Sequence, residues 1–239
     1  MIAALALLAA AAAAGQTVAD AERAFAEQAR TGGQWNAFRA FAAPDAVLYS
    51  PTATPARTVL SRAIEPTTPL LWRPAHTLTS CDGTLAYSTG PWTKDGKSGS
   101  FGTLWRHDTA GWKWIYDGGH DGGVLASAPI GAVAEDHAAC PGPIGSVGEQ
   151  TEVLPDVAVP VATLRGGALA SLIMASDGPM SASLHLGHAT EEGASVDRTL
   201  RWRINPVRDA ATGAHLLRIW SWDGRRYRLA VFDVTGTRS

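Results

Sequence analysis

Residues 102–119 read GTLWRHDTAGWKWIYDGG, and this stretch decides the fold class. Apolar and aromatic residues alternate with polar ones on both sides of a turn at residues 108–111. Alternation of this kind is typical of two antiparallel strands joined by a hairpin. The pattern predicts strands over residues 100–107 and 112–117.

Strict alternation also assigns the side chains of this hairpin to faces. It places three aromatic residues on one face of the second strand: Trp112, Trp114 and Tyr116. It places three residues on one face of the first strand: Phe101, Thr103 and Trp105. Asp117 then falls on the face opposite the tryptophans, so we expect an aromatic wall without a carboxyl group in it.

Two short helices are predicted before any strand. Thr17 and Asp20 have the spacing of a helix N-cap and its third position, and apolar residues recur at helical intervals up to residue 32. A second helix over residues 34–43 ends at Pro44. The expected strands before the hairpin are 46–50, 70–73, 75–80 and 84–89, with a helical turn near 59–64. Helices followed by an antiparallel meander predict the α+β class.

The first fifteen residues, MIAALALLAAAAAAG, form an uncharged apolar run that ends in small residues. This run is typical of a secretory signal peptide cut near Gly15 or Gln16, and the alternative is a buried Ala-rich helix. We therefore expect a periplasmic or secreted protein with no membrane attachment after cleavage. The predicted organisation is a signal peptide at 1–15, a first domain at 16–120, a linker at 121–150 and a β-rich domain at 151–239.

The second half of the chain matches the first at a constant offset of 115 residues. Matched residues include Ser80 with Ser195, Asp82 with Asp197, Thr84 with Thr199, Leu85 with Leu200, and Trp105 with Trp220. The match predicts that residues 195–233 repeat the meander of residues 80–117. The alternative is that two unrelated meanders share turn residues and strand tryptophans.

Charge and cysteine content exclude several functional classes. A net charge of -2 with 18% charged residues offers no basic stripe for phosphates, so we expect no nucleic-acid partner. Cys81 and Cys140 are the two cysteines, and they either form one disulfide bond or remain free thiols. The sequence contains no Cys-x-x-Cys pair, P-loop or Gly-x-Gly-x-x-Gly segment, so we expect neither a metal ion nor a cofactor.

Several segments together carry a family resemblance: AERAF, WNAFRAFAAPDAVLYSP, LLWRPAH, LAYSTGPW and the hairpin itself. Over about residues 19–119 the chain resembles the nuclear transport factor 2-like superfamily, and more narrowly an exported bacterial branch of it. The resemblance implies a cystatin-like cone, in which helices pack on a curved antiparallel sheet around an apolar cavity. The superfamily includes SnoaL-like cyclases and ketosteroid isomerase-like enzymes, which often place an acid or base near the end of the last strand.

Nine tryptophans in 239 residues indicate an aromatic pocket, although any single ring is more readily explained as part of the core. The predicted ligand-binding residues are Trp35, Phe38, Tyr49, Trp72, His76, Tyr87, Trp105, Trp114 and Tyr116. His76 and Asp117 are weak candidates for acid–base chemistry.

These observations favour an exported protein that binds a small apolar molecule in the cone without catalysis. One alternative is an enzyme of the SnoaL or ketosteroid isomerase type that moves a proton on an apolar cyclic substrate. Another is an interaction or dimerisation scaffold, with the open sheet face as the surface that would form a homodimer. A buried histidine or carboxyl group that points into the cavity near a second polar group would favour the enzyme, whereas rings alone would favour binding.

Overall fold

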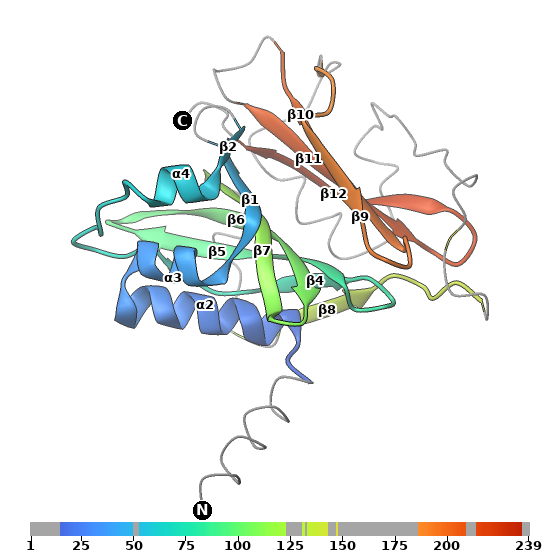
Figure 1. Ribbon diagram of the computed structural model, residues 1–239, viewed down its shortest axis with the longest axis horizontal. Helices are drawn as coiled ribbons and strands as arrows, with labels where there is room; N and C mark the ends of the chain where they lie inside the picture. The colour runs from blue at the N-terminus through green and yellow to red at the C-terminus, as the bar shows by residue number, and fades with distance from the viewer. Residues whose placement is uncertain are drawn as a thin grey trace, which may run out of the picture.

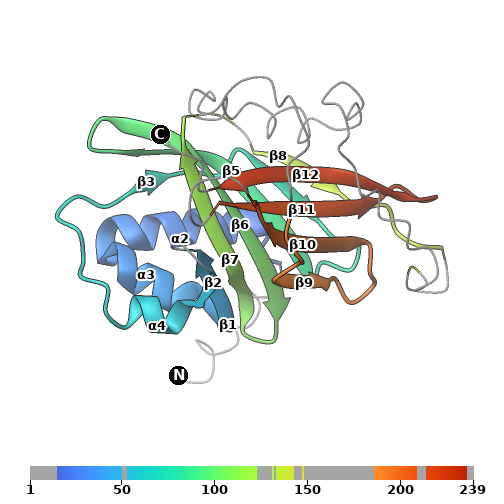
Figure 2. The same cartoon turned by 90° about the horizontal axis from the view of Figure 1, so that it is seen from above.

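The computed structural model describes residues 15–49, 53–122, 131, 133–142, 147, 186–208 and 214–235. These residues form two β-sheets, with helices on one side of the larger sheet and the smaller sheet on its other side (Figures 1 and 2). The predicted α+β class is therefore confirmed. The predicted signal peptide lies outside the described residues except for Gly15, as do most of the linker and the start of the second domain.

The helices begin where the sequence provides caps. Helix α2 (Val18–Gly32) starts with a capping box, in which the Asp20 amide donates to Thr17 Oγ1 at 3.2 Å and the Asp20 carboxylate accepts from the Thr17 amide. Helix α3 (Gln34–Phe41) follows directly after Gly33, whose φ of 103° suits glycine. Helix α4 (Ala56–Leu60) is a short third helix.

The larger sheet has the strand order β2-β1-β7-β6-β5-β4-β8, and β3 pairs with β5. Its strands are β1 (Ala42–Tyr49), β2 (Ala53–Pro55), β3 (Leu71–Trp72), β4 (His76–Thr79), β5 (Leu85–Lys94), β6 (Lys97–Asp108), β7 (Gly111–Asp121) and β8 (Ala134–His137). Pairing is antiparallel except between β1 and β7 and between β4 and β8. The sheet is thus mixed, and part of the predicted linker forms its edge strand β8.

The smaller sheet is antiparallel with the order β12-β11-β10-β9. Its strands are β9 (Glu191–Ala194), β10 (Leu200–Pro206), β11 (His215–Trp222) and β12 (Tyr227–Thr235). Its residue pairings are those of β4–β7 displaced by 115 residues, which is also the separation of Asp82 and Asp197. The register irregularity follows the same displacement, since it falls between Leu104 and Trp105 in β6 and between Ile219 and Trp220 in β11.

The two sheets meet along a contact surface that we call the seam, and two equivalent turns form one part of it. The Asp82 amide donates to Asp197 Oδ2 at 2.8 Å, and the Asp197 amide donates to Asp82 Oδ2 at 2.6 Å. The other carboxylate oxygen of each aspartate accepts bonds within its own turn, from Ser80 and Thr84 or from the matching Ser195 and Thr199. Each aspartate therefore stabilises its own turn with one carboxylate oxygen and binds the other turn with the second.

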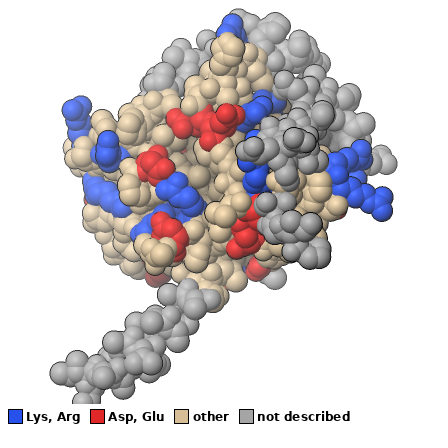
Figure 3. Space-filling view, turned by 45° about the vertical axis from the view of Figure 1, so that its right-hand side comes forward, with Lys and Arg blue, Asp and Glu red and all other residues tan. Residues whose placement is uncertain are grey.

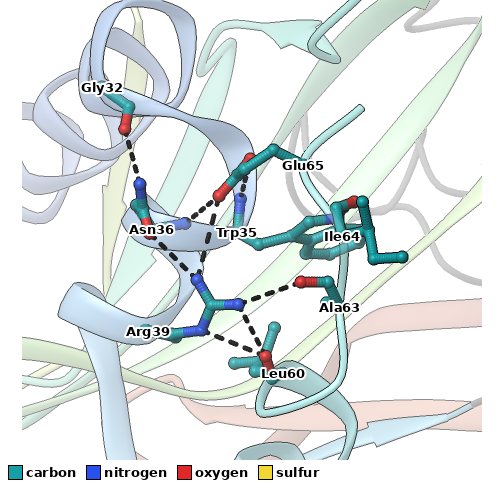
Figure 4. A network of polar contacts seen from close by, with 8 residues as sticks. All are labelled: Gly32, Trp35, Asn36, Arg39, Leu60, Ala63, Ile64 and Glu65. Atoms are coloured by element: carbon teal, nitrogen blue, oxygen red, sulfur yellow. Dashed lines mark hydrogen bonds and ion pairs between the residues drawn. The ribbon is translucent and has the colours of Figure 1, made fainter. Parts of the chain in front are cut away.

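The loop between α4 and β3 is fixed to the start of α3 by a polar network (Figure 4). The Glu65 carboxylate accepts the backbone N–H groups of Trp35 at 3.0 Å and Asn36 at 2.8 Å. It thus satisfies donors that Gly33 has no side chain to cap. Arg39 donates to the carbonyl oxygen of Leu60, the last residue of α4, and to that of Ala63 in the loop, and the Trp35 indole N–H donates to the carbonyl oxygen of Ile64.

Candidate functional site

The nine predicted ligand-binding residues divide between the two faces of the larger sheet. Five lie on the side of the helices: Trp35, Phe38, Trp72, Trp105 and Trp114. Four lie on the opposite face: Tyr49, His76, Tyr87 and Tyr116. The structure therefore does not bring the nine residues together in one site.

A β-bulge in β7 corrects the predicted faces of Tyr116 and Asp117. Trp114 pairs with Trp105 but Tyr116 pairs with Leu104, so Ile115 is an extra residue in β7. Tyr116 consequently points away from the tryptophans, and its hydroxyl lies 3.0 Å from His215 Nε2. Asp117 returns to the side of the tryptophans. Both expectations from strict alternation were wrong, because alternation cannot register an inserted residue.

Glu22 of α2 is the buried centre of the helix-facing side. Its carboxylate accepts three bonds, from Trp72 Nε1 at 2.7 Å, Ser88 Oγ at 2.5 Å and Trp105 Nε1 at 3.0 Å. The residue is 0% exposed, and burial raises its pKa while these hydrogen bonds oppose the rise. The prediction missed Glu22. One signal was present, because Glu22 lies at helical spacing within the apolar stripe of α2.

Asp117 shares this side of the sheet. Thr103 Oγ1 donates to its carboxylate at 2.8 Å. The pKa of Asp117 is raised to about 8, chiefly by burial; the Thr103 hydrogen bond lowers it, and the negative charge of Glu22 raises it by a smaller amount. Unlike Glu22, the residue keeps part of its surface accessible. At neutral pH Asp117 is therefore mostly protonated, and it can donate a hydrogen bond to a molecule that reaches it.

Aromatic rings pack against one another between the helices and the sheet. Phe25 is at their centre, with ring centroids 4.8 Å from Phe38, 4.9 Å from Trp72 and 5.9 Å from Trp105. Trp72 is only half-buried, as is Trp35 on α3. This side of the sheet thus combines stacking surfaces for an apolar molecule with two carboxyl groups of unequal accessibility.

The opposite face carries a second polar cluster, which joins the two sheets. Tyr87 donates to Asp233 Oδ2 at 3.3 Å, and His120 Nδ1 lies 3.8 Å from Asp233 Oδ1. Tyr49 stacks on His215, with ring centroids 4.0 Å apart. Burial raises the pKa values of Tyr87 and Asp233. The sheet face that was expected to form a homodimer is thus in contact with the smaller sheet of the same chain.

The remaining predicted residues have clear positions. His76 is half-buried on the face opposite Glu22, and burial lowers its pKa, whereas the negative charge of Asp136 raises it. It is thus separated by the sheet from Asp117, the other weak candidate for acid–base chemistry. Cys81 and Cys140 form a disulfide bond, which decides between the two alternatives.

Within the described part of the chain, no three or more His, Cys, Asp or Glu residues are grouped to hold a metal ion. Over the same residues, no helix has the length and apolar character needed to cross a membrane. Acidic and basic side chains are interspersed on the face in Figure 3, without a continuous basic stripe. No protein-family model matches the sequence, and neither curated proteins nor solved structures give a significant match.

Proposed function

We propose that this chain is an exported protein that binds a small apolar molecule between the helices and the sheet of its first domain. The ligand is a neutral, ring-containing molecule that offers one hydrogen-bond acceptor to Asp117. A single observation carries this proposal: Asp117 is a half-buried residue whose carboxyl group keeps its proton at neutral pH, and it lies on the same side of the sheet as a cluster of aromatic rings.

The charges on this side of the sheet favour a neutral ligand. Glu22 already accepts three hydrogen bonds and is inaccessible, so it offers nothing to a ligand. The Thr103 hydroxyl donates to Asp117. The Asp117 proton is therefore the group on this side of the sheet that can still direct a hydrogen bond to a ligand. Ring stacking adds roughly 0.5–1.5 kcal/mol per aromatic pair.

We further propose that residues 16–120 are a nuclear transport factor 2-like cone and that residues 195–233 are a diverged copy of residues 80–117. Helices α2 and α3 on one face of the sheet support the first assignment. The shared strand pairings, the matching bulge and the reciprocal turns support the second. Export to an oxidising compartment agrees with the disulfide bond.

Native mass spectrometry of the full chain tests the ligand proposal. We expect a retained small molecule in the unaltered protein and at least roughly tenfold less of it in Asp117→Asn, because the amide replaces the donated O–H with a weaker and differently directed N–H. Tyr87→Phe is the matched control, since Tyr87 lies on the opposite face of the same sheet. Equal loss in both variants, or no retained molecule under any condition, would contradict the assignment.

One observation favours a second function, proton transfer by Asp117. A pKa of about 8 lies close to neutral pH, where a general acid or base is most effective. If Asp117 moves a proton, deuterium from heavy water will enter an acidic C–H position of the retained molecule, and Asp117→Asn will abolish that exchange. Absence of exchange in the unaltered protein would leave binding alone.

A further inference from the structure

The disulfide bond lies at the seam rather than within the first domain alone. Cys81 occupies the turn between β4 and β5, and Cys140 follows β8. Their Cα atoms are 5.1 Å apart, and the bridge closes a loop with a sequence separation of 59. Cys140 is exposed, so a reductant in solution can reach the bridge.

The backbone around Cys81 is bonded to the smaller sheet. The Cys81 amide donates to Thr199 Oγ1 at 2.9 Å, and the next amide, that of Asp82, donates to Asp197 Oδ2 at 2.8 Å. The equivalent bond runs in the other direction, from the Val196 amide to Thr84 Oγ1 at 3.0 Å. The bridged residue is therefore itself part of the contact between the turns.

The backbone around Cys140 is bonded to the smaller sheet as well. The Ala139 amide donates to the Trp222 carbonyl oxygen at 2.9 Å, and the Val147 amide donates to the Asp197 carbonyl oxygen at 3.0 Å. Val147 also packs against Trp220. Both ends of the disulfide bond thus belong to segments that hold β9–β12, and the bond fixes those segments relative to each other.

We propose that the Cys81–Cys140 bond is a redox-sensitive clamp that controls the turn-to-turn part of the seam. A dithiol reductant supplies two electrons and two protons, the S–S bond breaks to two thiols, and the dithiol becomes a disulfide. The chain from Cys140 onward then loses its covalent link to the Cys81 turn while β8 stays paired with β4, and the loss of this link weakens the reciprocal bonds of Asp82 and Asp197. The tyrosine contacts of the seam stay in place, because Tyr87–Asp233 and Tyr116–His215 belong to other strands.

Hydrogen exchange of the full chain, with and without dithiothreitol, tests the clamp. We expect exchange at the amides of Asp82, Val196 and Asp197 to rise at least roughly tenfold on reduction, while amides in the centre of β6 and β12 keep their protection. Alkylation of the released thiols measures the extent of reduction in the folded protein. The double variant Cys81→Ser/Cys140→Ser, without reductant, is expected to give the same local pattern.

Three outcomes would overturn the proposal. The folded protein could resist reduction by dithiothreitol, which would show that the bridge is not redox-sensitive. The turn amides could keep their protection after complete reduction, which would show that the bridge does not control the seam. Exchange could also rise uniformly over β4–β7, which would make the bond a general stabiliser of the first domain. None of these readouts depends on the ligand proposed above.

Discussion

The segments β4–β7 and β9–β12 share a strand register but differ in what their faces carry. Three matched positions on the helix-facing side of the first segment show the difference: Ser88 corresponds to Arg203, Thr103 to Arg218, and Asp117 to Phe232. In the first segment, Ser88 donates to the buried carboxylate of Glu22, and Thr103 donates to Asp117 on the same side of the sheet. In the second, Arg218 donates to Asn205 and lies over the Trp220 ring.

This difference shows that the residues that set the strand register of a β-meander are not the ones that give its faces their chemical character. The turns and the position of the bulge set the strand register of each segment, because a turn fixes which residues pair and an inserted residue shifts that pairing by one position. The residue types on each sheet face depend instead on the elements that pack against that face. Helices cover the first segment, so its buried polar groups need internal partners, whereas the second segment carries Arg203 and Arg218 at the matching positions. The largest losses should therefore follow damage to the shared turns.

Asp197→Ala should have the largest effect on the comparison. Its carboxylate accepts three bonds within its own turn and one from the Asp82 amide, and the residue is only 6% exposed. We expect the free energy of unfolding to fall by about 3 kcal/mol in a urea titration, because several buried donors lose their acceptor. Asp82→Ala should be somewhat milder, since Asp82 is more exposed.

The control for this pair is Asp223→Ala, in the exposed turn between β11 and β12. Asp223 also accepts backbone N–H groups, those of Arg225 and Arg226, and it forms an ion pair with Arg228 in the same hairpin, so its side-chain bonds described here stay within the smaller sheet. We expect a loss of about 1 kcal/mol or less there. If all three alanine variants lose the same stability, the reciprocal contact adds nothing beyond ordinary turn formation.

Asp117→Asn should have the next largest effect, and it depends on pH. The pKa of Asp117 is raised from 3.8 to about 8 in the folded chain, so the folded state holds the proton after the unfolded state has lost it. Stability of the unaltered protein therefore falls as pH rises from about 4 to about 8. The asparagine variant lacks this term, so it should match the unaltered protein near pH 4 and exceed it by about 2 kcal/mol near pH 8.5, a figure reduced for the partial accessibility of Asp117.

Melting temperatures measured across this pH range check the sign. Asp121→Asn is the control, because Asp121 is an exposed carboxyl group at the end of the same strand. Its stability profile should run parallel to that of the unaltered protein. A parallel profile for Asp117→Asn as well would mean that the buried site does not hold its proton, and the donor role proposed for Asp117 would be lost.

Much of the fold could be predicted from local patterns. Thr17 and Asp20 gave the start of α2, and Asp108 to Gly111 gave the hairpin, because caps and turns depend on residues close in sequence. Strand partners were harder. The parallel pairing of β8 with β4 joins residues near 135 to residues near 77, and nothing in the period of either segment encodes that contact.

The site was predicted only in part, and the bulge explains why. One extra residue at Ile115 exchanged the faces of Tyr116 and Asp117, so Asp117, the carboxyl group in the proposed site, was assigned to the wrong side of the sheet. Glu22 was overlooked because a charged residue in an amphipathic helix is normally exposed. Its acceptance of two tryptophan N–H groups depends on tertiary contacts 50 and 83 residues away in sequence.

Glu65→Ala should have a smaller effect, confined to the helical cover of the first segment. The variant removes the acceptor for the Trp35 and Asn36 amides at the start of α3. Loss of a helix cap lowers stability by about 1 kcal/mol, and hydrogen exchange at the first turn of α3 should rise accordingly. Glu27→Ala is the control, because it removes only an exposed ion pair with Arg30, and its stability should stay close to that of the unaltered protein.

The smallest effect distinguishes the two matched turns themselves. Gly83 and Arg198 occupy the same position in each turn, with φ values of 70° and 61°, yet only one is glycine. A Cβ at Gly83 would meet no atom within 4 Å, so Gly83→Ala tests the backbone conformation alone. We expect it to lower stability by about 1 kcal/mol, because a left-handed conformation is unfavourable for residues with a Cβ atom.

Arg198→Gly should act in the opposite direction, with a gain below about 1 kcal/mol, since the greater freedom of glycine in the unfolded chain offsets part of the relief. Because both variants leave the hydrogen-bonding side chains of Asp82 and Asp197 intact, opposite signs in parallel urea titrations would show that the two turns share one backbone conformation. If Gly83→Ala is neutral, the first turn does not need its left-handed residue, and the equivalence of the two turns rests on side chains alone.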